Sequence, residues 1–95
     1  METCCFDYEY VRRLTDGDAA IEAHFTAYFG NLLTLKLRNK LRSGHAIDDI
    51  RQETFLRVFQ TLRQRRGLEH PERLGAFVNS VCNNVLLENF RAQSR

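Results

Sequence analysis

Apolar residues recur at steps of three and four along almost the whole of this chain, and no other feature limits its fold as strongly. This period places apolar side chains on one face of an α-helix, whereas a half-buried strand needs strict alternation. Glycine is scarce and there is one proline, so few positions interrupt the pattern. The sequence therefore predicts an all-α fold, a compact bundle of about four helices at residues 7–15, 19–41, 46–65 and 71–92.

Short polar breaks separate the predicted helices. Asp7 can cap the first helix, and Asp16-Gly17-Asp18 combines a helix-ending Gly with a helix-starting Asp. Ser43-Gly44-His45 forms the next break. The loop after Gly67 leads to Pro71, which suits the first turn of a helix.

The length suits one domain, and no segment predicts export or a membrane span. A chain of 95 residues can bury a single core, and we expect the domain to span 7–95 behind a flexible tail at 1–6. No apolar run approaches the roughly 20 residues of a membrane span. The N-terminus lacks the basic and apolar stretches of a signal peptide. The sequence therefore predicts a cytoplasmic protein.

Cysteine and histidine follow no catalytic or metal-binding pattern. Cys4 and Cys5 are adjacent in the expected tail, whereas Cys82 falls on an apolar helix face, where a buried thiol behaves as a small hydrophobe. The histidines are scattered rather than paired at chelating spacing: His24, His45 and His70. No Ser/His/Asp or Cys/His arrangement, glycine-rich phosphate loop or carboxylate cluster is present. We therefore expect no enzyme activity, no metal and no cofactor.

The charges divide unevenly along the chain. Residues 1–50 carry six Lys/Arg against eight Asp/Glu, a net −2, and residues 51–95 carry eight against four, a net +4. This division hints at different partners on different surfaces. One basic group lies near the end of the second helix, where cations suit the helix dipole: Lys36, Arg38, Lys40 and Arg42.

Two of the long helices have an inner stripe that predicts core residues. In the second helix the stripe is aromatic and aliphatic: Ile21, Phe25, Tyr28, Phe29, Leu32, Leu33 and Leu37. In the last helix the expected buried residues are Leu74, Val78, Val81, Cys82 and Val85. Both stripes follow the period of an amphipathic helix.

The stretch from Asp48 to Phe59 predicts one helix with two different faces. At about 100° per residue, one half is apolar: Ile47, Ile50, Phe55, Val58, Phe59 and Leu62. The opposite half is polar: Asp49, Glu53, Arg57 and Gln60. Gln52 and Leu56 lie at the border. The polar half is either an ordinary solvated surface or one that another protein binds.

The last helix has a polar stripe beside its buried one. Its members follow one another at steps of three, four, three, one and three: Phe77, Ser80, Asn84, Leu87, Glu88 and Arg91. Four asparagines within eleven residues exceed what a structural helix needs, because Asn is a mediocre helix former. Each amide offers a donor and an acceptor, the combination that reads base edges. This stripe is either solvated surface or a nucleic-acid-binding surface.

Three blocks of the sequence together form a known pattern. The first runs from Val11-Arg12-Arg13-Leu14 through Gly17-Asp18-Ala19 to Phe25 and Tyr28. The second is the stretch from Asp48 to Phe59, and the third comprises Phe77-Val78, Val81, Asn84, Glu88 and Arg91. With these blocks, residues 7–95 resemble the second conserved region of extracytoplasmic-function sigma factors, the promoter-recognition subunits of bacterial RNA polymerase.

The resemblance implies that the middle helix binds RNA polymerase. In the family, the polar side of this helix docks on the coiled coil of the polymerase's largest subunit. The matching positions here are Asp49, Gln52, Glu53 and Leu56. Acids and an amide can pair with Arg and Lys on a partner helix, and a central Leu can serve as an apolar anchor.

The resemblance also implies that the last helix binds promoter DNA. In the family, this helix and the loop before it melt the minus-ten element and hold its non-template strand, with one base turned out of the stack. The matching positions are Phe77, Ser80, Asn84, Glu88 and Arg91, and the loop at residues 66–74 would shape the pocket for the base. An aromatic ring there would be a stacking platform. An anti-sigma factor would be a further partner.

The sequence departs from the family at several of these positions. Phe77 stands where the family has Trp, Ser80 where a basic residue is common, and the tail after Arg91 lacks the usual run of Arg. Arg51, where the family is usually apolar, falls in the predicted buried half, so its stem should pack while its head reaches outward.

Two alternatives remain open at this point. One is a helical module that binds polymerase or an anti-sigma factor without reading DNA, and the other is an unrelated bundle with a chance motif. Family members continue through a linker into a helix-turn-helix domain that reads the minus-thirty-five element. We expect this chain to be a domain excised from such a protein, with a naturally short relative as the alternative.

Overall fold

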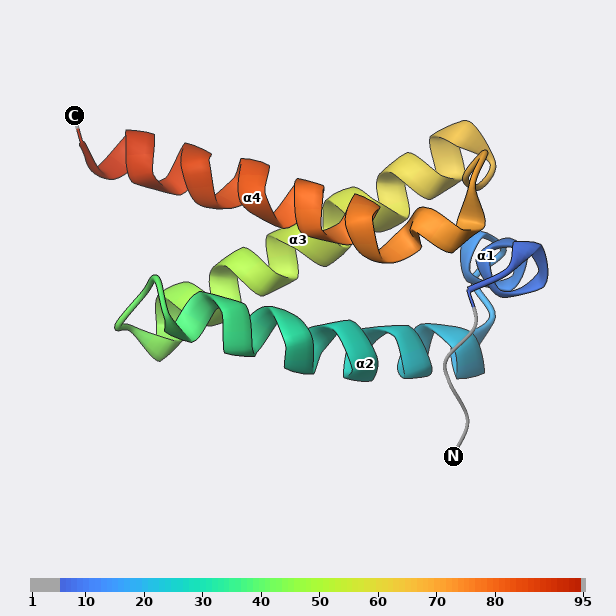
Figure 1. Ribbon diagram of the computed structural model, residues 1–95, viewed down its shortest axis with the longest axis horizontal. Coiled ribbons are helices and arrows are strands. Elements are labelled where there is room, and N and C mark those ends of the chain that lie inside the picture. Colours follow the sequence, from blue (N-terminus) through green and yellow to red (C-terminus); the bar gives the residue numbers. More distant parts are fainter. Residues whose placement is uncertain (1–5, 95) are drawn as a thin grey trace.

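The fold is all-α over the part of the chain that the structure describes. The computed structural model describes residues 6–94, which form four α-helices and a short 3-10 helix and contain no strand. The elements are α1 (Tyr8–Thr15), α2 (Ala19–Arg38), α3 (Gly44–Arg65), η1 (Pro71–Arg73) and α4 (Leu74–Gln93) (Figure 1). The predicted fold class and the number of helices are confirmed.

Side-chain caps decide where three of the helices begin. Asp7 and Asp18 accept hydrogen bonds from first-turn backbone N–H groups of α1 and α2, as the sequence predicted. Ser43 Oγ accepts from the backbone N–H of Ala46, so α3 begins at Gly44, earlier than expected. Each cap satisfies an amide that has no partner within the helix.

The ends of α2 and α3 are closed by backbone turns. α2 ends at Arg38, earlier than expected, because N–H groups of the following turn donate to the carbonyl of Leu37. After α3, Arg66 adopts the left-handed conformation with φ of 58° and Gly67 follows with φ of 113°. The N–H of Gly67 donates to the carbonyl of Leu62 over 2.9 Å. A side chain at position 67 would strain this turn, which explains the glycine.

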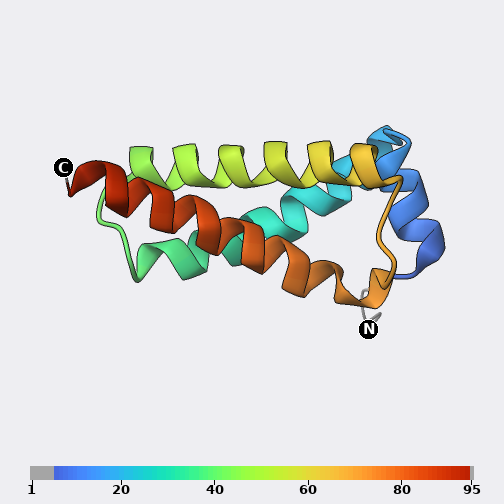
Figure 2. The same cartoon turned by 90° about the horizontal axis from the view of Figure 1, so that it is seen from above.

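The three long helices form the body of the bundle, and α1 closes one end. α3 packs against both α2 and α4, which lie on opposite sides of it in Figure 1. The view from above shows α1 at the end where α2 begins and α3 finishes (Figure 2). The Tyr8 hydroxyl of α1 donates to the carbonyl of Glu69, which ties α1 to the loop before α4.

The core lies between the inner stripes of α2, α3 and α4. Its largest fully buried side chains are Phe25, Leu37, Ile50, Leu62, Leu74, Val58 and Val78. Phe25 is 0% exposed, and its ring centroid lies 4.9 Å from that of Phe29, 5.6 Å from Phe55 and 5.5 Å from Phe59. Phe55 and Phe59 are half-buried at the edge of this cluster. Tilted and edge-to-face pairs of this kind add to the stability that burial supplies.

Several predicted core residues are not fully buried, among them Ile21 of α2 and Phe55 and Phe59 of α3, which are half-buried. Tyr28 is 40% exposed and Leu32 48% exposed, so the prediction that they belong to the inner stripe of α2 is wrong. α3 and α4 cover only the side of α2 that carries Phe25 and Phe29, and the apolar residues of α2 extend beyond that side. Val81 of α4 is half-buried rather than buried, at the edge of the core.

Two further residues are buried although the apolar pattern did not select them. Thr54 is completely buried, and its hydroxyl donates to the carbonyl of Ile50 one turn earlier. That bond makes a polar side chain acceptable inside the core. Leu86 of α4 is also buried. Cys82 is a free thiol in the core, as predicted, and burial raises the pKa of its thiol.

Arg51 lies between α2 and α3 with its stem packed and its head near the surface. Its guanidinium donates to Thr34 Oγ1 over 2.7 Å and to Asp48 Oδ1 over 2.8 Å. A Cβ built at Gly30 would lie 3.9 Å from Arg51 Cδ, so the stem passes over the glycine backbone. The expected packing of the stem is confirmed.

Phe6, which the sequence assigned to the flexible tail, packs against the domain. The Phe6 ring packs against Tyr10, Tyr28 and Phe29, with centroid distances of 5.0, 5.6 and 5.4 Å. The expected tail therefore loses its last residue, while residues 1–5, including Cys4 and Cys5, lie outside the described residues. None of the described helices combines the length and apolar character that a membrane crossing requires.

Candidate functional site

Four residues predicted to bind a protein lie together on α3. Asp49, Gln52 and Leu56 are exposed, and Glu53 is half-buried. The centre of the exposed side is Leu56, which is 52% exposed, with Gln52 beside it. This corrects the predicted geometry, which placed Gln52 and Leu56 at the border. We call Asp49, Gln52, Glu53 and Leu56 the α3 surface.

Arg57 reaches across to α4, and Glu53 lies beside it on α3. The Arg57 guanidinium donates to Glu53 on its own helix over 2.8 Å and to both carboxylate oxygens of Glu88 on α4 over 2.8 and 2.7 Å. The prediction that Arg57 lies on the outward half is therefore wrong. A bidentate arginine–carboxylate pair has a defined geometry as well as opposite charges, so this contact links α3 to α4 near the surface.

The ion pair shifts the titration of both partners. Hydrogen bonds from Arg57 lower the pKa of Glu88, and hydrogen bonds to Glu88 and Glu53 raise the pKa of Arg57. Both shifts mean that the charged forms are favoured in the folded protein. Because Glu53 was assigned to polymerase binding and Glu88 to DNA binding, Arg57 joins the two predicted surfaces into one continuous region.

A shallow groove of about 350 Å³ follows this junction. Its lining comes from both helices: Asp49, Ile50, Glu53, Arg57, Val85, Glu88 and Asn89. Of the predicted site residues, the structure therefore brings Asp49, Glu53 and Glu88 to one groove. Gln52 and Leu56 face away from it on the outer side of α3.

The residues predicted to bind DNA form a single stripe on α4. Ser80, Asn84, Glu88 and Arg91 are exposed and Phe77 is half-buried against the core. We call Phe77, Ser80, Asn84, Glu88 and Arg91 the α4 stripe. Within residues 6–94 the Asn84 side chain makes no hydrogen bond, so both its donor and its acceptor are available.

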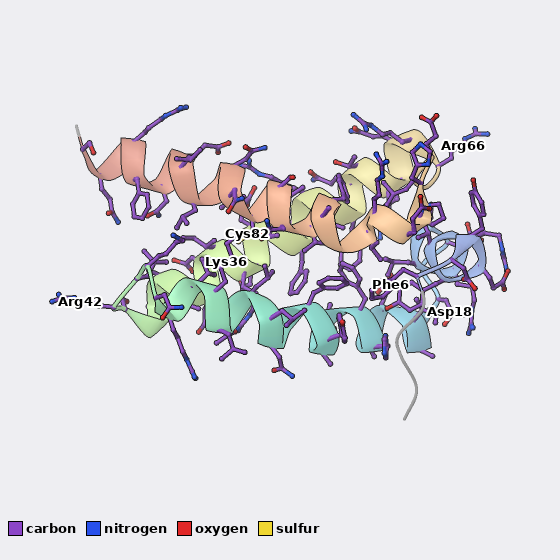
Figure 3. All side chains as sticks on the ribbon, in the orientation of Figure 1. Phe6, Asp18, Lys36, Arg42, Arg66 and Cys82 are labelled. Atoms are coloured by element: carbon purple, nitrogen blue, oxygen red, sulfur yellow. The ribbon has the colours of Figure 1, made fainter. Side chains whose placement is uncertain are left out.

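Two other asparagines of α4, Asn79 and Asn83, point toward α2, whereas Asn89 lines the groove between α3 and α4. Lys36 of α2 donates to the side-chain oxygens of both Asn79 and Asn83 (Figure 3). These two amides therefore hold α4 to α2. The sequence did not predict these hydrogen bonds, because Lys36 belongs to a basic group that the helix dipole at the end of α2 already explained.

The loop before α4 shapes a pocket, but not against the α4 stripe. A groove of about 570 Å³ lies between this loop and α1, and its lining includes Tyr8, Arg12, Arg63, Arg66 and Leu68. Arg66 lies at the end of α3, away from the core (Figure 3). None of the described lining residues belongs to α4. In this groove the loop therefore faces α1, whereas the sequence resemblance implied that the loop shapes a pocket beside the α4 stripe.

Among residues 6–94, no three His, Cys, Asp or Glu side chains gather in a way that could hold a metal ion. Comparison with known proteins finds no match among family models, curated proteins or solved structures. The function must therefore be argued from the α3 surface and the α4 stripe themselves.

The Arg57–Glu88 pair predicts a pH dependence. The folded state lowers the pKa of Glu88, so the pair stabilises the fold above the ordinary glutamate pKa of about 4.3 and loses this effect as the pH falls through the lower, folded value. Urea unfolding followed from pH 7 to pH 3 should therefore show a smaller acid-induced loss of stability for Glu88→Gln than for the wild type.

Glu69→Gln is the matched control for this prediction. Glu69 is exposed, and within residues 6–94 its carboxylate forms no ion pair. Glu69→Gln should lose as much stability between pH 7 and pH 3 as the wild type does. If Glu88→Gln follows the same acid profile as the wild type, the Arg57–Glu88 pair does not stabilise the folded state.

Proposed function

We propose that this chain is a sigma-factor domain that binds RNA polymerase through α3 and the minus-ten promoter strand through α4. The observation that carries the proposal is the joint placement of the two surfaces. The α3 surface and the α4 stripe lie on adjacent helices that pack through the core and are linked by the Arg57–Glu88 pair. RNA polymerase could thus bind α3 while the neighbouring α4 contacts DNA.

The chemistry of the α3 surface suits a helical partner rich in Arg and Lys. Leu56 is an exposed apolar side chain next to the amide of Gln52 and the carboxylates of Asp49 and Glu53. Burial of a central apolar residue supplies affinity, whereas surrounding charges supply orientation and rate of association. The coiled coil of the polymerase's largest subunit is the partner that the sequence resemblance implies for such a surface.

The α4 stripe offers the groups that a single DNA strand needs. The free amide of Asn84 can read the edge of an exposed base, since it supplies a donor and an acceptor together. The half-buried ring of Phe77 can contact a base, and Arg91 can attract phosphate. A domain with this role would act in transcription initiation in the cytoplasm, with an anti-sigma factor as a further partner.

A titration with DNA tests the proposal. A fluorescent single strand carrying the minus-ten element is added to the domain fused to the polymerase's coiled-coil fragment. We expect a preference over a scrambled strand, and Asn84→Ala should weaken binding about tenfold, because one amide–base contact contributes roughly 1–3 kcal/mol.

Asn79→Ala is the matched control in this titration. Asn79 lies on the same helix, but its amide oxygen accepts from Lys36 on the α2 side. The control should retain the affinity and the sequence preference. Binding that ignores the DNA sequence and tolerates Asn84→Ala would exclude DNA reading by the α4 stripe.

A protein-interaction module without DNA reading is the second candidate. The observation in its favour is the charge of the α4 stripe, where Arg91 is balanced by Glu88 and position 80 is a serine. Little net attraction to phosphate remains on this stripe. In that case the fused domain would bind the coiled coil or an anti-sigma factor normally, and the titration above would show no sequence preference.

A further inference from the structure

The outward side of α2 carries exposed apolar side chains that neither α3 nor α4 covers. At its N-terminal end the Tyr10 hydroxyl forms a hydrogen bond with His24 Nδ1 over 2.8 Å, and the Phe6 ring packs against Tyr28. Between Ala23 and Leu35 the helix contains no charged residue. Leu35 is 59% exposed, and it joins the exposed Tyr28 and Leu32. We call His24, Tyr28, Asn31, Leu32 and Leu35 the α2 face. A contiguous apolar surface of this kind on a small domain marks an interaction site more often than chance exposure.

The α2 face has the spacing of a helix-packing seam. His24, Tyr28, Asn31 and Leu35 follow one another at steps of four, three and four, the repeat by which one helix packs along another. The inner side of α2 already carries the residues of the core. The helix is therefore apolar on two sides, which is typical of a helix that is covered on both.

The charges that flank this face have opposite signs at its two ends. Residues 7–22, which form α1 and the start of α2, carry five acids against two arginines, a net −3. Residues 38–42 at the other end carry three Lys or Arg and no acid, a net +3, while Lys36 is turned toward α4. Asp18 and Arg42 mark these opposite ends in Figure 3.

We infer that the α2 face binds a second copy of this chain, with the two α2 helices antiparallel. In that orientation the acidic end of each copy lies beside the basic end of the other, whereas a parallel pairing would bring like charges together. A two-fold axis near Asn31 makes the contact self-complementary, as a symmetric dimer requires. The contact uses neither the α3 surface nor the α4 stripe, so it does not depend on the proposed function.

Sedimentation equilibrium of the full chain tests the dimer. The wild type should show a monomer–dimer equilibrium, and its dissociation constant should rise with salt because the flanking charges are screened. Leu32→Glu combined with Leu35→Glu should raise the dissociation constant at least tenfold, and circular dichroism should show the same helix content. The control, Leu56→Glu with Leu87→Glu, alters two equally exposed leucines elsewhere and should leave the equilibrium unchanged.

Disulfide trapping tests the orientation in a background with Cys4→Ser and Cys5→Ser. In an antiparallel pair centred at Asn31, position 24 of one copy faces position 38 of the other, while the two copies of position 24 lie about 20 Å apart. A mixture of His24→Cys and Arg38→Cys chains should therefore cross-link, and either chain alone should not. A chain that stays monomeric at millimolar concentration, or cross-links formed by each variant alone, would overturn the inference.

Discussion

Replacing Phe25 by alanine is expected to destabilise the protein by about 3–5 kcal/mol, the cost of deleting a fully buried aromatic ring. Phe25 is 0% exposed and contacts three other rings, from α2 and α3. The substitution removes buried apolar area and leaves a cavity that these neighbours can fill only in part. A small domain is stable by only about 5–15 kcal/mol, so this loss is a large share of the total.

Urea unfolding followed by circular dichroism measures this effect at low protein concentration. The matched comparison is Leu32→Ala, which alters a residue that the sequence assigned to the same inner stripe. Leu32 is 48% exposed, so its truncation should cost less than about 1 kcal/mol. Equal losses for the two variants would mean that the apolar pattern, rather than the observed burial, describes α2 correctly.

Replacing Leu56 by aspartate is expected to weaken binding to the polymerase's coiled coil about thirtyfold or more, which corresponds to roughly 2 kcal/mol. Leu56 lies at the centre of the exposed side of α3. An apolar side chain at the centre of an interface is buried on binding, and a carboxylate there must lose its hydration without a partner of matched geometry. The fold should be unaffected, because this position faces solvent.

Leu87→Asp provides a closely matched control. Leu87 is 50% exposed against 52% for Leu56, and it lies on α4 instead of α3. Titration calorimetry with the isolated coiled coil should show wild-type affinity for this variant. If both substitutions leave the affinity unchanged, and Gln52→Ala combined with Glu53→Ala does as well, the unrelated-bundle alternative becomes the better explanation.

The helices themselves followed from local rules. The acids at positions 7 and 18 cap helices where predicted, and the glycine at 67 follows α3 in a conformation that other residues avoid. These features depend on contacts within a few residues, so a single stretch of sequence contains all that is needed. The apolar pattern placed the end of α2 a few residues too late and the start of α3 two residues too late. The backbone turn on the carbonyl of Leu37 and the Ser43 cap determine these boundaries instead.

The candidate surfaces were only partly visible in the sequence. The family resemblance and the helical period identified which residues form the α3 surface. They did not show that Leu56 lies at its centre. Periodicity gives the angle of a side chain around its helix, and it does not say which angles the neighbouring helices cover. For that reason Arg57 was expected to face solvent, whereas its guanidinium pairs with Glu88 of α4.

By itself, the sequence determined the fold class, the four helices and most of the buried residues, because caps, turns and apolar period act over one or two helical turns. Only the tertiary structure decided which side of each helix is covered. It joined Arg57 to Glu88, 31 residues away, placed Lys36 against Asn79 and Asn83, and left the α2 face open. These contacts depend on how the helices pack against one another, and a pattern within one helix carries no information about its neighbour.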